Sequence, residues 1–509
     1  MTRRILGPGP VAFLAIWLLL LAGGRTRFFH DPDTFWHTVV GRTIIDTGYF
    51  FDRDPFSGSH AGDKWIPHQW LGEVAMGLLD RVGGFDALLL ASVTILAGTF
   101  APLFARLVRA GLHWLPAAML TGLALAAAAG HFHVRPHLVT LAGFAFLFTR
   151  LADFDTGRIQ FQKLLWLIPV FLVWSNTHGG ALGGLATFAL ALGGWAAARL
   201  LGWPSPIRTL GDTLKLLGLF GLLCATPFVN PYGPDLPRCW FEILRMGELK
   251  TIIQEHAALD VRSPAAWPIL AFAAVYVLAL LGTRQRPRAT WLIPLVWLAL
   301  GIECIRHSSI FAVTALVALA DVIPATTWAR RLIESESDLF RRAGSADPCG
   351  ISSLILPLVA VLTAIGLQSA GVRVPVIGRG WAGLDPTVWP VDMIETLNRE
   401  AAGRNGIRTF NEYADGGFLI YFAPQYRPFV DGRCELFGGP WLKAFVEAES
   451  GDVGAYLKVM EGQYGRFEAA LTRTGSGFDS CFRTAAEWTL VRETPTASFY
   501  RRKADSAVR

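Results

Sequence analysis

Residues 30–73 read HDPDTFWHTVVGRTIIDTGYFFDRDPFSGSHAGDKWIPHQWLGE and directly follow the first long apolar run of the chain. Acidic and imidazole side chains are concentrated here, at Asp31, Asp33, His37, Asp46, Asp52, Asp54, His60, Asp63, His68 and Glu73. Ionisable groups beside a bilayer usually line a substrate path or an active site. Aromatic residues interleave with them, at Phe35, Trp36, Trp65 and Trp70. This mixture predicts a folded, partly buried segment, whereas the alternative is a solvated connecting loop.

The composition of the whole chain is that of a membrane protein. Its 509 residues are 52% hydrophobic and 17% charged, with a mean hydropathy of +0.39, which is too apolar for an ordinary soluble protein. The net charge of +6 fits basic cytoplasmic loops. No basic-aromatic tract accompanies it, so nucleic acid is not expected as a partner. The cysteines show no CxxC spacing, and no zinc or redox motif is indicated.

Apolar runs predict a polytopic transmembrane helical bundle with about eleven spans, judged by the length needed to cross a bilayer. The runs cover residues 10–23, 85–107, 112–130, 138–151, 164–176, 181–201, 214–228, 267–281, 291–303, 310–324 and 351–368. Arg3 and Arg4 predict a cytoplasmic N-terminus, and every second connection is again basic, ending with Arg residues between 330 and 342. The alternate loops, including residues 30–73, therefore face outward from a multi-pass protein of the cell membrane.

The sequence after the last span predicts a small α/β domain. Strands are expected at IRTFNEY (407–413), GGFLIYF (416–422) and RPFVDGR (427–433), then a helix at 441–449 and a hairpin of TLVRE with SFYRRK. An odd number of spans places this domain outside the cell. The expected fold class is mainly α, with a membrane domain over 1–370, an external loop over 24–84, and a soluble extracytoplasmic α/β domain over 371–509.

Asp31 and Asp33 are the candidate catalytic residues, because a partly shielded carboxylate at a membrane surface can serve as a general base. Glycosyl transfer needs a base for the attacking hydroxyl and a cation for the leaving phosphate. The alternative is structural, with Asp31-Pro32 forming a turn and cap before a helix that starts near Thr34. We favour Asp33, since Asp31 precedes a proline and is better suited to the turn.

The other candidate site residues lie in the outward turns and are expected to bind substrate. They are His37, His68, Glu73, His131, His133, Arg135, His137, His178, Arg306 and His307. Arg135 with its neighbouring imidazoles is a candidate phosphate clamp, and we expect it to converge with Asp33. Close helix packing is the alternative at His178 and its glycines, and a Glu303–Arg306 ion pair is the alternative at the last turn. Asp431, Gly432 and Arg433 are expected to be exposed at a strand–turn junction.

Motifs spread over nearly the whole chain carry a resemblance. They are DPDTFWH (31–37), DPFS (54–57), HQWLGE (68–73), VRPHL (134–138), WSNTHGG (174–180), NPYG (230–233), FNEYADGGFLIY (410–421) and FVDGR (429–433). Together they resemble a bacterial group of membrane glycosyltransferase-like proteins. More distantly, the chain is similar to the GT-C superfamily, with its oligosaccharyltransferases, protein mannosyltransferases and aminoarabinose transferase. The resemblance implies polyprenyl-phosphate-linked donors and an acidic residue in the first external loop, at Asp31 or Asp33.

The expected function is therefore transfer of a sugar from a polyprenyl phosphate to a cell-envelope glycan, lipid or protein, at the external face of the membrane. The alternative is a non-catalytic transporter or assembly partner for a surface polysaccharide or glycolipid. The chain lacks the second-loop DxD and the WWD motif of oligosaccharyltransferases, which argues against peptide N-glycosylation and an obligate metal. No cofactor and no metal ligand is assigned, and a divalent metal is not favoured. Membrane lipid is the remaining expected partner.

Overall fold

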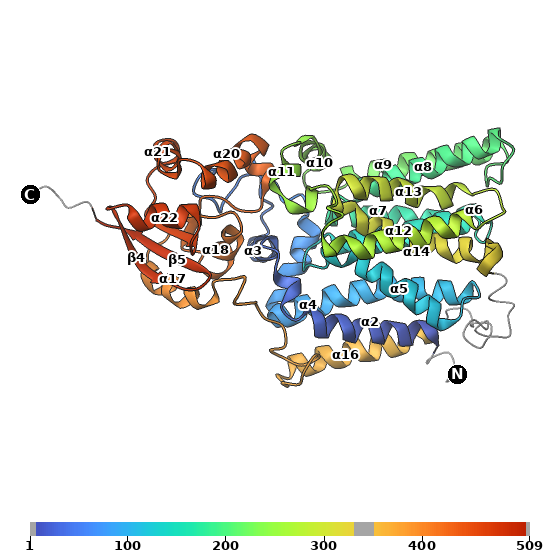
Figure 1. Ribbon diagram of the computed structural model, residues 1–509, viewed down its shortest axis with the longest axis horizontal. Helices are drawn as coiled ribbons and strands as arrows, with labels where there is room; N and C mark the ends of the chain where they lie inside the picture. Colours follow the sequence, from blue (N-terminus) through green and yellow to red (C-terminus); the bar gives the residue numbers. More distant parts are fainter. Residues whose placement is uncertain (1–6, 330–350, 505–509) are drawn as a thin grey trace, which may run out of the picture.

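The computed structural model describes residues 7–329 and 351–504. A helical bundle and a smaller α/β unit lie one after the other along the long axis of the molecule (Figure 1). Arg3, Arg4 and the basic residues between 330 and 342, which contributed to the predicted orientation, lie outside the described residues.

Each of the predicted apolar runs is helical. The helices are α2 (Pro8–Gly24), α4 (Trp70–Arg109), α5 (Trp114–Ala128), α6 (Leu138–Asp155), α7 (Leu167–Thr177), α8 (Ala181–Leu200), α9 (Leu210–Ala225), α12 (Trp267–Leu281), α13 (Ala289–Glu303), α14 (Ser308–Ala325) and α16 (Ile355–Ser369). Within the described chain, seven helices are long and apolar enough to cross a membrane, and α2 and α13 are shorter apolar helices. The predicted polytopic bundle with a small C-terminal α/β unit is confirmed.

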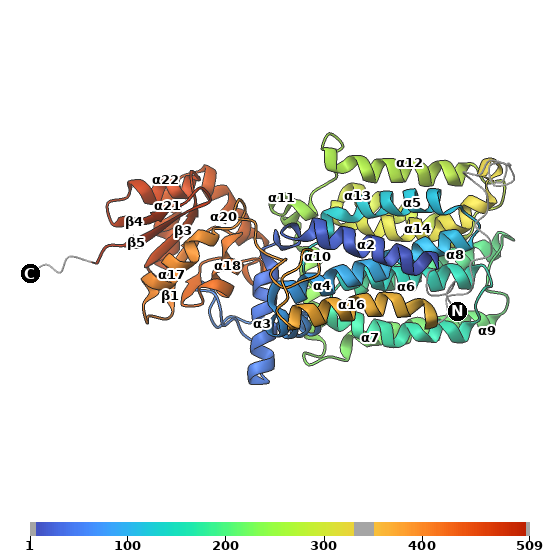
Figure 2. The same cartoon turned by 90° about the horizontal axis from the view of Figure 1, so that it is seen from below.

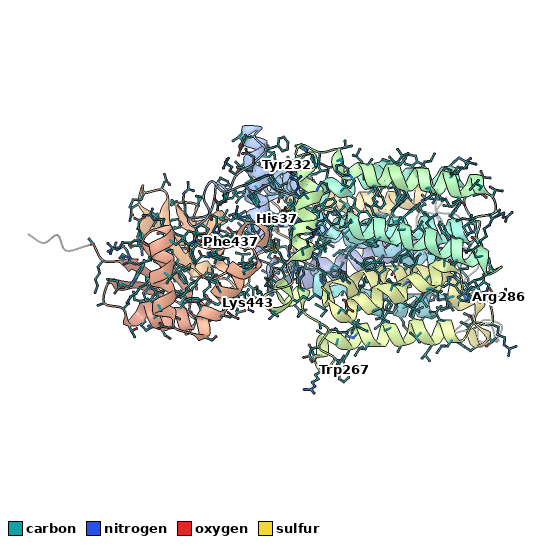
Figure 3. The ribbon with its side chains drawn as sticks, turned by 90° about the horizontal axis from the view of Figure 1, so that it is seen from above. His37, Tyr232, Trp267, Arg286, Phe437 and Lys443 are labelled. Carbon is teal, nitrogen blue, oxygen red and sulfur yellow. The ribbon has the colours of Figure 1, made fainter. Side chains whose placement is uncertain are left out.

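A network of ion pairs ties three helices together at the end of the bundle remote from the α/β unit. Arg106 of α4 lies 2.8 Å from Asp153 of α6 and 3.2 Å from Asp321 of α14. Arg158 pairs with the same two carboxylates, at 2.7 and 2.6 Å. Figure 3 labels Arg286 at this end. The basic residues Arg106, Arg158 and Arg286 thus lie at one end of the bundle, while the side of the membrane on which they lie stays a prediction.

The first external segment, so named for the predicted topology and covering residues 24–84, forms a layer between the bundle and the α/β unit. It contains η1 (Arg27–Phe29) and α3 (Asp33–Thr47), and α3 crosses the bundle end transversely (Figure 2). The first turns of α4 belong to the same layer, because α4 is broken at Gly84, whose φ of 60° suits glycine. Phe35, Trp36 and Trp65 are buried. The segment is therefore folded, as its aromatic residues predicted.

The α/β unit is built on a five-stranded mixed sheet in the order β2-β1-β3-β5-β4. The strands are β1 (Ile407–Asn411), β2 (Tyr426–Pro428), β3 (Ala469–Arg473), β4 (Trp488–Glu493) and β5 (Ala497–Arg502). β1 runs parallel to β2 and β3, and β5 runs antiparallel to β3 and β4. Its helices are α17 (Ile394–Ala401), α18 (Asp415–Phe422), α19 (Cys434–Phe437), α20 (Gly439–Ser450), α21 (Val453–Tyr464) and α22 (Gly477–Thr484). The predicted helix at 441–449 and the closing hairpin are present.

The strand predicted at 416–422 is wrong, because this run is helix α18. β1 and β2 are parallel neighbours, and a parallel pair needs a crossover connection, which α18 supplies. α18 is apolar on most of its surface because it is enclosed, with Phe418 and Leu419 fully buried. Its Gly416 and Gly417 pack against backbone of the 429–433 segment and of the turn before α3.

The α/β unit shares its core with the first external segment. Phe35 of α3 packs edge-on against Trp389 at a ring-centroid distance of 4.9 Å, and also against Phe418 and Phe422. The predicted exposure of Asp431, Gly432 and Arg433 is wrong, since these residues are buried. They face the first external segment instead of solvent. The division at residues 370 and 371 stays a prediction, and residues 380–382 are bonded to Asp86 of the bundle.

Candidate functional site

The carboxyl groups of Asp31 and Asp33 meet at the start of α3. Asp31 Oδ1 accepts a hydrogen bond from the backbone N–H of Asp33 at 2.9 Å, which is the turn-stabilising role predicted as the alternative for Asp31. Asp33 Oδ1 accepts a hydrogen bond from Trp36 Nε1 at 2.9 Å. The second oxygen of each carboxylate faces Arg135. Asp31 thus has a structural role that Asp33 does not share.

Arg135 bridges these two carboxylates. Its Nη1 lies 2.8 Å from Asp31 Oδ2, and its Nη2 lies 2.8 Å from Asp33 Oδ2. A third carboxylate, Glu255 of η5 (Gln254–His256), has Oε1 3.8 Å from Nη1. The expected convergence of Arg135 with Asp33 is therefore direct contact. The positive charge predicted to clamp a phosphate is already surrounded by carboxylates.

The protonation of these carboxyl groups differs. Burial raises the pKa of Asp33 to about 7, Arg135 opposes this shift, and the charge of Asp31 adds to it. Burial also acts on Glu255, but the charges of Arg135 and Arg306 outweigh it and bring the pKa of Glu255 below its usual range. A group with a pKa near neutrality can both accept and release a proton at physiological pH. Asp33 is thus the carboxylate of this cluster whose pKa suits a general base.

A second group of polar side chains surrounds Arg306 on η7 (Ile305–His307). Its Nη2 lies 3.3 Å from His178 Nε2, and its Nη1 lies 3.2 Å from His256 Nε2. Arg306 makes no ion pair with any residue that the structure describes. The Glu303–Arg306 pair offered as the alternative is therefore absent from this part of the chain.

The tautomer of His178 leaves this group with two hydrogen-bond donors and so with room for a hydrogen-bond acceptor between them. The backbone N–H of Gly180 donates to His178 Nδ1 at 2.9 Å, and Thr140 Oγ1 lies 2.8 Å from the same nitrogen. Because Nδ1 accepts, the proton of the neutral imidazole is on Nε2. The Nε2–H and the Arg306 guanidinium are then two donors that face each other. An oxyanion placed beside both would accept from both.

Both groups face one cavity of about 1080 Å³ between the bundle end and the α/β unit. Of the predicted site residues, those that line it are Asp31, Asp33, His68, His131, Arg135, His137, His178, Arg306 and His307. Its bundle end is apolar, with Leu182, Ala186 and Trp297 among its lining residues, and its other end includes Tyr413 and Phe478 of the α/β unit.

Three predicted site residues lie behind this lining. His37 and Glu73 form a buried pair, with 2.9 Å between His37 Nδ1 and Glu73 Oε1, and Figure 3 labels His37 at the junction of the two parts. His133 is close to Asp31 and Glu255 without lining the cavity. Their assignment as substrate-binding residues stays a prediction.

The residues Asp31, His133 and Glu255 could hold a divalent cation. Their ligand atoms all lie within 4.8 Å of one another. His133 Nδ1 is buried and has no hydrogen-bond partner among the described residues. Two carboxylates and an imidazole are a donor set that Mn²⁺ or Zn²⁺ accepts. Asp31, His133 and Glu255 therefore fit a divalent cation, which the sequence does not favour. The Asp31 carboxylate is also paired with Arg135.

Comparisons with known proteins identify the fold. No family model and no curated protein sequence matches the chain. The oligosaccharyltransferase AglB from Archaeoglobus fulgidus, solved with an inhibitory peptide and a dolichol-phosphate, aligns with 91% of this chain and 69% of its own, at 12% identity and a TM-score of 0.51. Its complex with a tethered acceptor peptide gives 0.50 over the same shares and identity.

This chain has a GT-C-like fold. The predicted distant resemblance to that superfamily is confirmed at the level of fold, and identities this low carry no more than the fold. ArnT from Cupriavidus metallidurans, solved with undecaprenyl phosphate, aligns with 97% of this chain and 98% of its own, at 13% identity and a TM-score of 0.49.

The cavity also contains residues that were not predicted from the sequence. Glu255 and His256 lie in the 230–264 loop, and Tyr413 and Glu435 belong to the α/β unit. The loop between α10 (Asp235–Arg245) and α12 is outward on the predicted topology, so the adjacent Glu255 and His256 were a usable signal. Glu435 lies two residues after Arg433, which was predicted to be exposed.

Proposed function

We propose that this protein is a membrane glycosyltransferase of GT-C type. It takes a sugar from a polyprenyl-phosphate donor and transfers it to a hydroxyl of a cell-envelope acceptor at the external face of the membrane. The observation that carries the proposal is one cavity with a near-neutral carboxyl, Asp33, and a pair of converging donors, Arg306 and His178.

The apolar end of the cavity supports a lipid-linked donor. It reaches into the bundle along the first turns of α8 and the last turns of α13, where Ala186 and Trp297 line it. Six residues of helix separate Ala186 from Gly180, which corresponds to about 9 Å of depth at the rise of an α-helix. Part of an isoprenoid chain fits such a space, with the phosphate at its mouth.

Arg306 and His178 are proposed to bind the phosphate of the donor. Their nitrogens Nη2 and Nε2 lie 3.3 Å apart at the cavity lining, and the charge of Arg306 is not compensated by an ion pair within the described chain. Donors that are already in place when negative charge develops on a leaving group stabilise the transition state without reorganisation.

Asp33 is proposed to be the general base. The acceptor hydroxyl attacks the anomeric carbon and transfers its proton to the Asp33 carboxylate. The new carbon–oxygen bond forms as the bond from the anomeric carbon to the phosphate oxygen breaks, and its electrons leave with the phosphate. A single displacement of this kind inverts the anomeric configuration. A divalent cation held by Asp31, His133 and Glu255 would add positive charge near the phosphate, and no step above depends on it.

The test is Asp33→Asn, which keeps the size of the side chain but removes the base. General-base catalysis contributes about 10²–10⁴ in rate, so transfer from a polyprenyl-phosphate sugar by membranes should fall by that factor at equal protein abundance. The matched control is Asp46→Asn on the same helix, whose carboxylate pairs with Arg81 at the surface and does not line this cavity.

Asp31→Asn separates the two aspartates. Asparagine caps a turn about as well as aspartate, so this variant should lose less activity than Asp33→Asn. Full activity in Asp33→Asn and in the double variant is incompatible with a catalytic carboxylate here. It would favour the transporter or assembly role.

A further inference from the structure

The α/β unit contributes a buried motif to the neighbourhood of Asp33. Phe429, Val430 and Asp431 are at most 1% exposed, and Arg433 is fully buried. The backbone of this segment is bonded to the first external segment, because Gly58 N–H donates to Pro428 O at 2.8 Å. The FVDGR motif (429–433) therefore lies at a buried contact between two parts of the chain that are far apart in the sequence. We call this contact the joint.

Arg433 stabilises this joint by pairing with carboxylates on both of its sides. Its Nη1 lies 2.5 Å from Asp54 Oδ1 of the first external segment, and its Nη2 lies 2.6 Å from Asp431 Oδ2. The guanidinium also stacks over Phe56 and Trp65, at 5.3 and 4.7 Å from the ring centres. A planar guanidinium that is hydrogen-bonded and stacked in this way is fixed in one orientation. Gly432, between Asp431 and Arg433, is held with it.

Gly432 lies directly against the carboxyl of Asp33. A Cβ added at Gly432 would overlap Asp33 Oδ1 and would lie 3.2 Å from Trp36 Nε1. Its φ does not lie in the left-handed region, so the backbone itself would accept alanine. The absence of a side chain at Gly432 is thus explained by the space that Asp33 occupies.

We propose that Gly432, held by the Asp431–Arg433–Asp54 joint, is a positioning residue for Asp33. Trp36 bonds one oxygen of Asp33, Arg135 bonds the other, and the Gly432 backbone closes the face between them. The α/β unit thereby sets the orientation of the carboxylate and keeps that face free of water. This inference rests on the proposed role of Asp33 as the base.

The test is Gly432→Ala, for which the methyl group has no space unless Asp33 moves. A displacement of about 1 Å at a reacting group can cost about 10²-fold, and we expect kcat to fall by about that factor while KM for the donor is unchanged. The matched control is Gly462→Ala, on the exposed side of α21, where an added Cβ meets nothing within 4 Å. Wild-type turnover in Gly432→Ala would overturn the proposal.

The split between kcat and KM distinguishes positioning from general damage. Loosening of the whole site would raise KM for the donor as well as lower kcat, whereas displacement of Asp33 alone should lower kcat only. A raised donor KM in Gly432→Ala would indicate a structural role only and would overturn the proposal.

The double variant with Asp33→Asn separates this proposal from the proposed function. If Gly432 acts through Asp33, adding Gly432→Ala to Asp33→Asn should cost no further activity, whereas additive losses overturn the proposal. Full activity of Asp33→Asn alone overturns the proposed function, whatever Gly432→Ala does. If Gly432→Ala does not accumulate in membranes, Asp54→Asn replaces it. That variant weakens the joint and should likewise lower kcat while KM for the donor is unchanged, and wild-type kcat overturns the proposal.

Discussion

Asp33 and Asp31 are two residues apart and contact the same guanidinium, but their surroundings give them different chemistry. Asp31 Oδ1 accepts a hydrogen bond within the turn before α3, whereas Asp33 Oδ1 accepts a hydrogen bond from the indole of Trp36. Burial is the largest influence on the pKa of Asp33 and raises it to about 7. The assignment of the base to Asp33 therefore has a consequence for the pH dependence of the reaction.

A general base must be deprotonated to act, so its activity falls as pH drops through its pKa. With a pKa near 7, kcat/KM should fall about tenfold per pH unit below 7 and should level off above about 8. A carboxylate of ordinary pKa would keep its activity down to about pH 4. Initial rates between pH 5.5 and 9 test this, with Asp46→Asn as the control for effects on folding. A level profile from pH 5.5 to 8 would contradict it.

Arg306 yields a prediction that does not depend on the sugar. Arg306→Gln removes the charge that faces His178, and hydrogen bonds to charged groups contribute about 1.5–3 kcal/mol. Undecaprenyl phosphate should therefore bind about 10–100-fold more weakly to this variant. Thermal stabilisation of the purified protein by added undecaprenyl phosphate measures the difference.

The control for that experiment is Arg262→Gln, at an exposed position of the 230–264 loop. Both variants lose one positive charge, but Arg262 does not line the cavity. Equal loss of binding in the two variants would reject a specific role for Arg306.

At this scale the sequence predicted which side chains meet, but not how they pair. The outward turns could be identified from hydropathy and basic loops, which is why Asp33, Arg135 and His178 could all be placed at one end of the bundle. Pairing depends on the rotation of each helix about its axis and on rotamers, and neither has a sequence signal strong enough to choose. Arg135 was therefore expected at a phosphate and is bonded to carboxylates instead.

Elements of the bundle were predictable because a bilayer-spanning helix has a long, uniform signal. The α/β unit offered only short apolar runs, for which periodicity cannot separate a strand from a buried helix. GGFLIYF shows this, since Phe418, Leu419 and Ile420 are all buried in helix α18. The deciding fact is the parallel pairing of β1 and β2, and pairing between strands is a tertiary property.

The contacts of α3 with the α/β unit were the least predictable from the sequence. Its Phe35 and Trp36 suggested a folded loop, but Phe35 in fact enters the core of the α/β unit. A core shared by segments separated by several hundred residues has no local pattern from which it could be predicted. The same kind of long-range contact explains why the burial of Asp431, Gly432 and Arg433 was not predicted.

The whole molecule carries its acidic, histidine-rich cavity at one end of the bundle and its basic loops at the other. Because short basic loops remain in the cytoplasm, the α/β unit should lie outside the cell. Alkaline phosphatase fused to the C-terminus should then be active, and the same reporter placed after Arg286 should be inactive. A fluorescent protein that matures only in the cytoplasm should give the reverse result at each position. An inactive C-terminal fusion beside an active one at Arg286 would reverse the proposed orientation.

The ion pairs at the basic end join three helices of the bundle. Arg106, Asp153 and Asp321 have side chains only 11%, 17% and 10% exposed, and breaking a buried pair costs about 3–5 kcal/mol. α4, α6 and α14 are consequently held together at that end. For a polyprenyl donor, we therefore expect entry of the lipid tail to displace helices at the cavity end of the bundle and not at the ion-paired end.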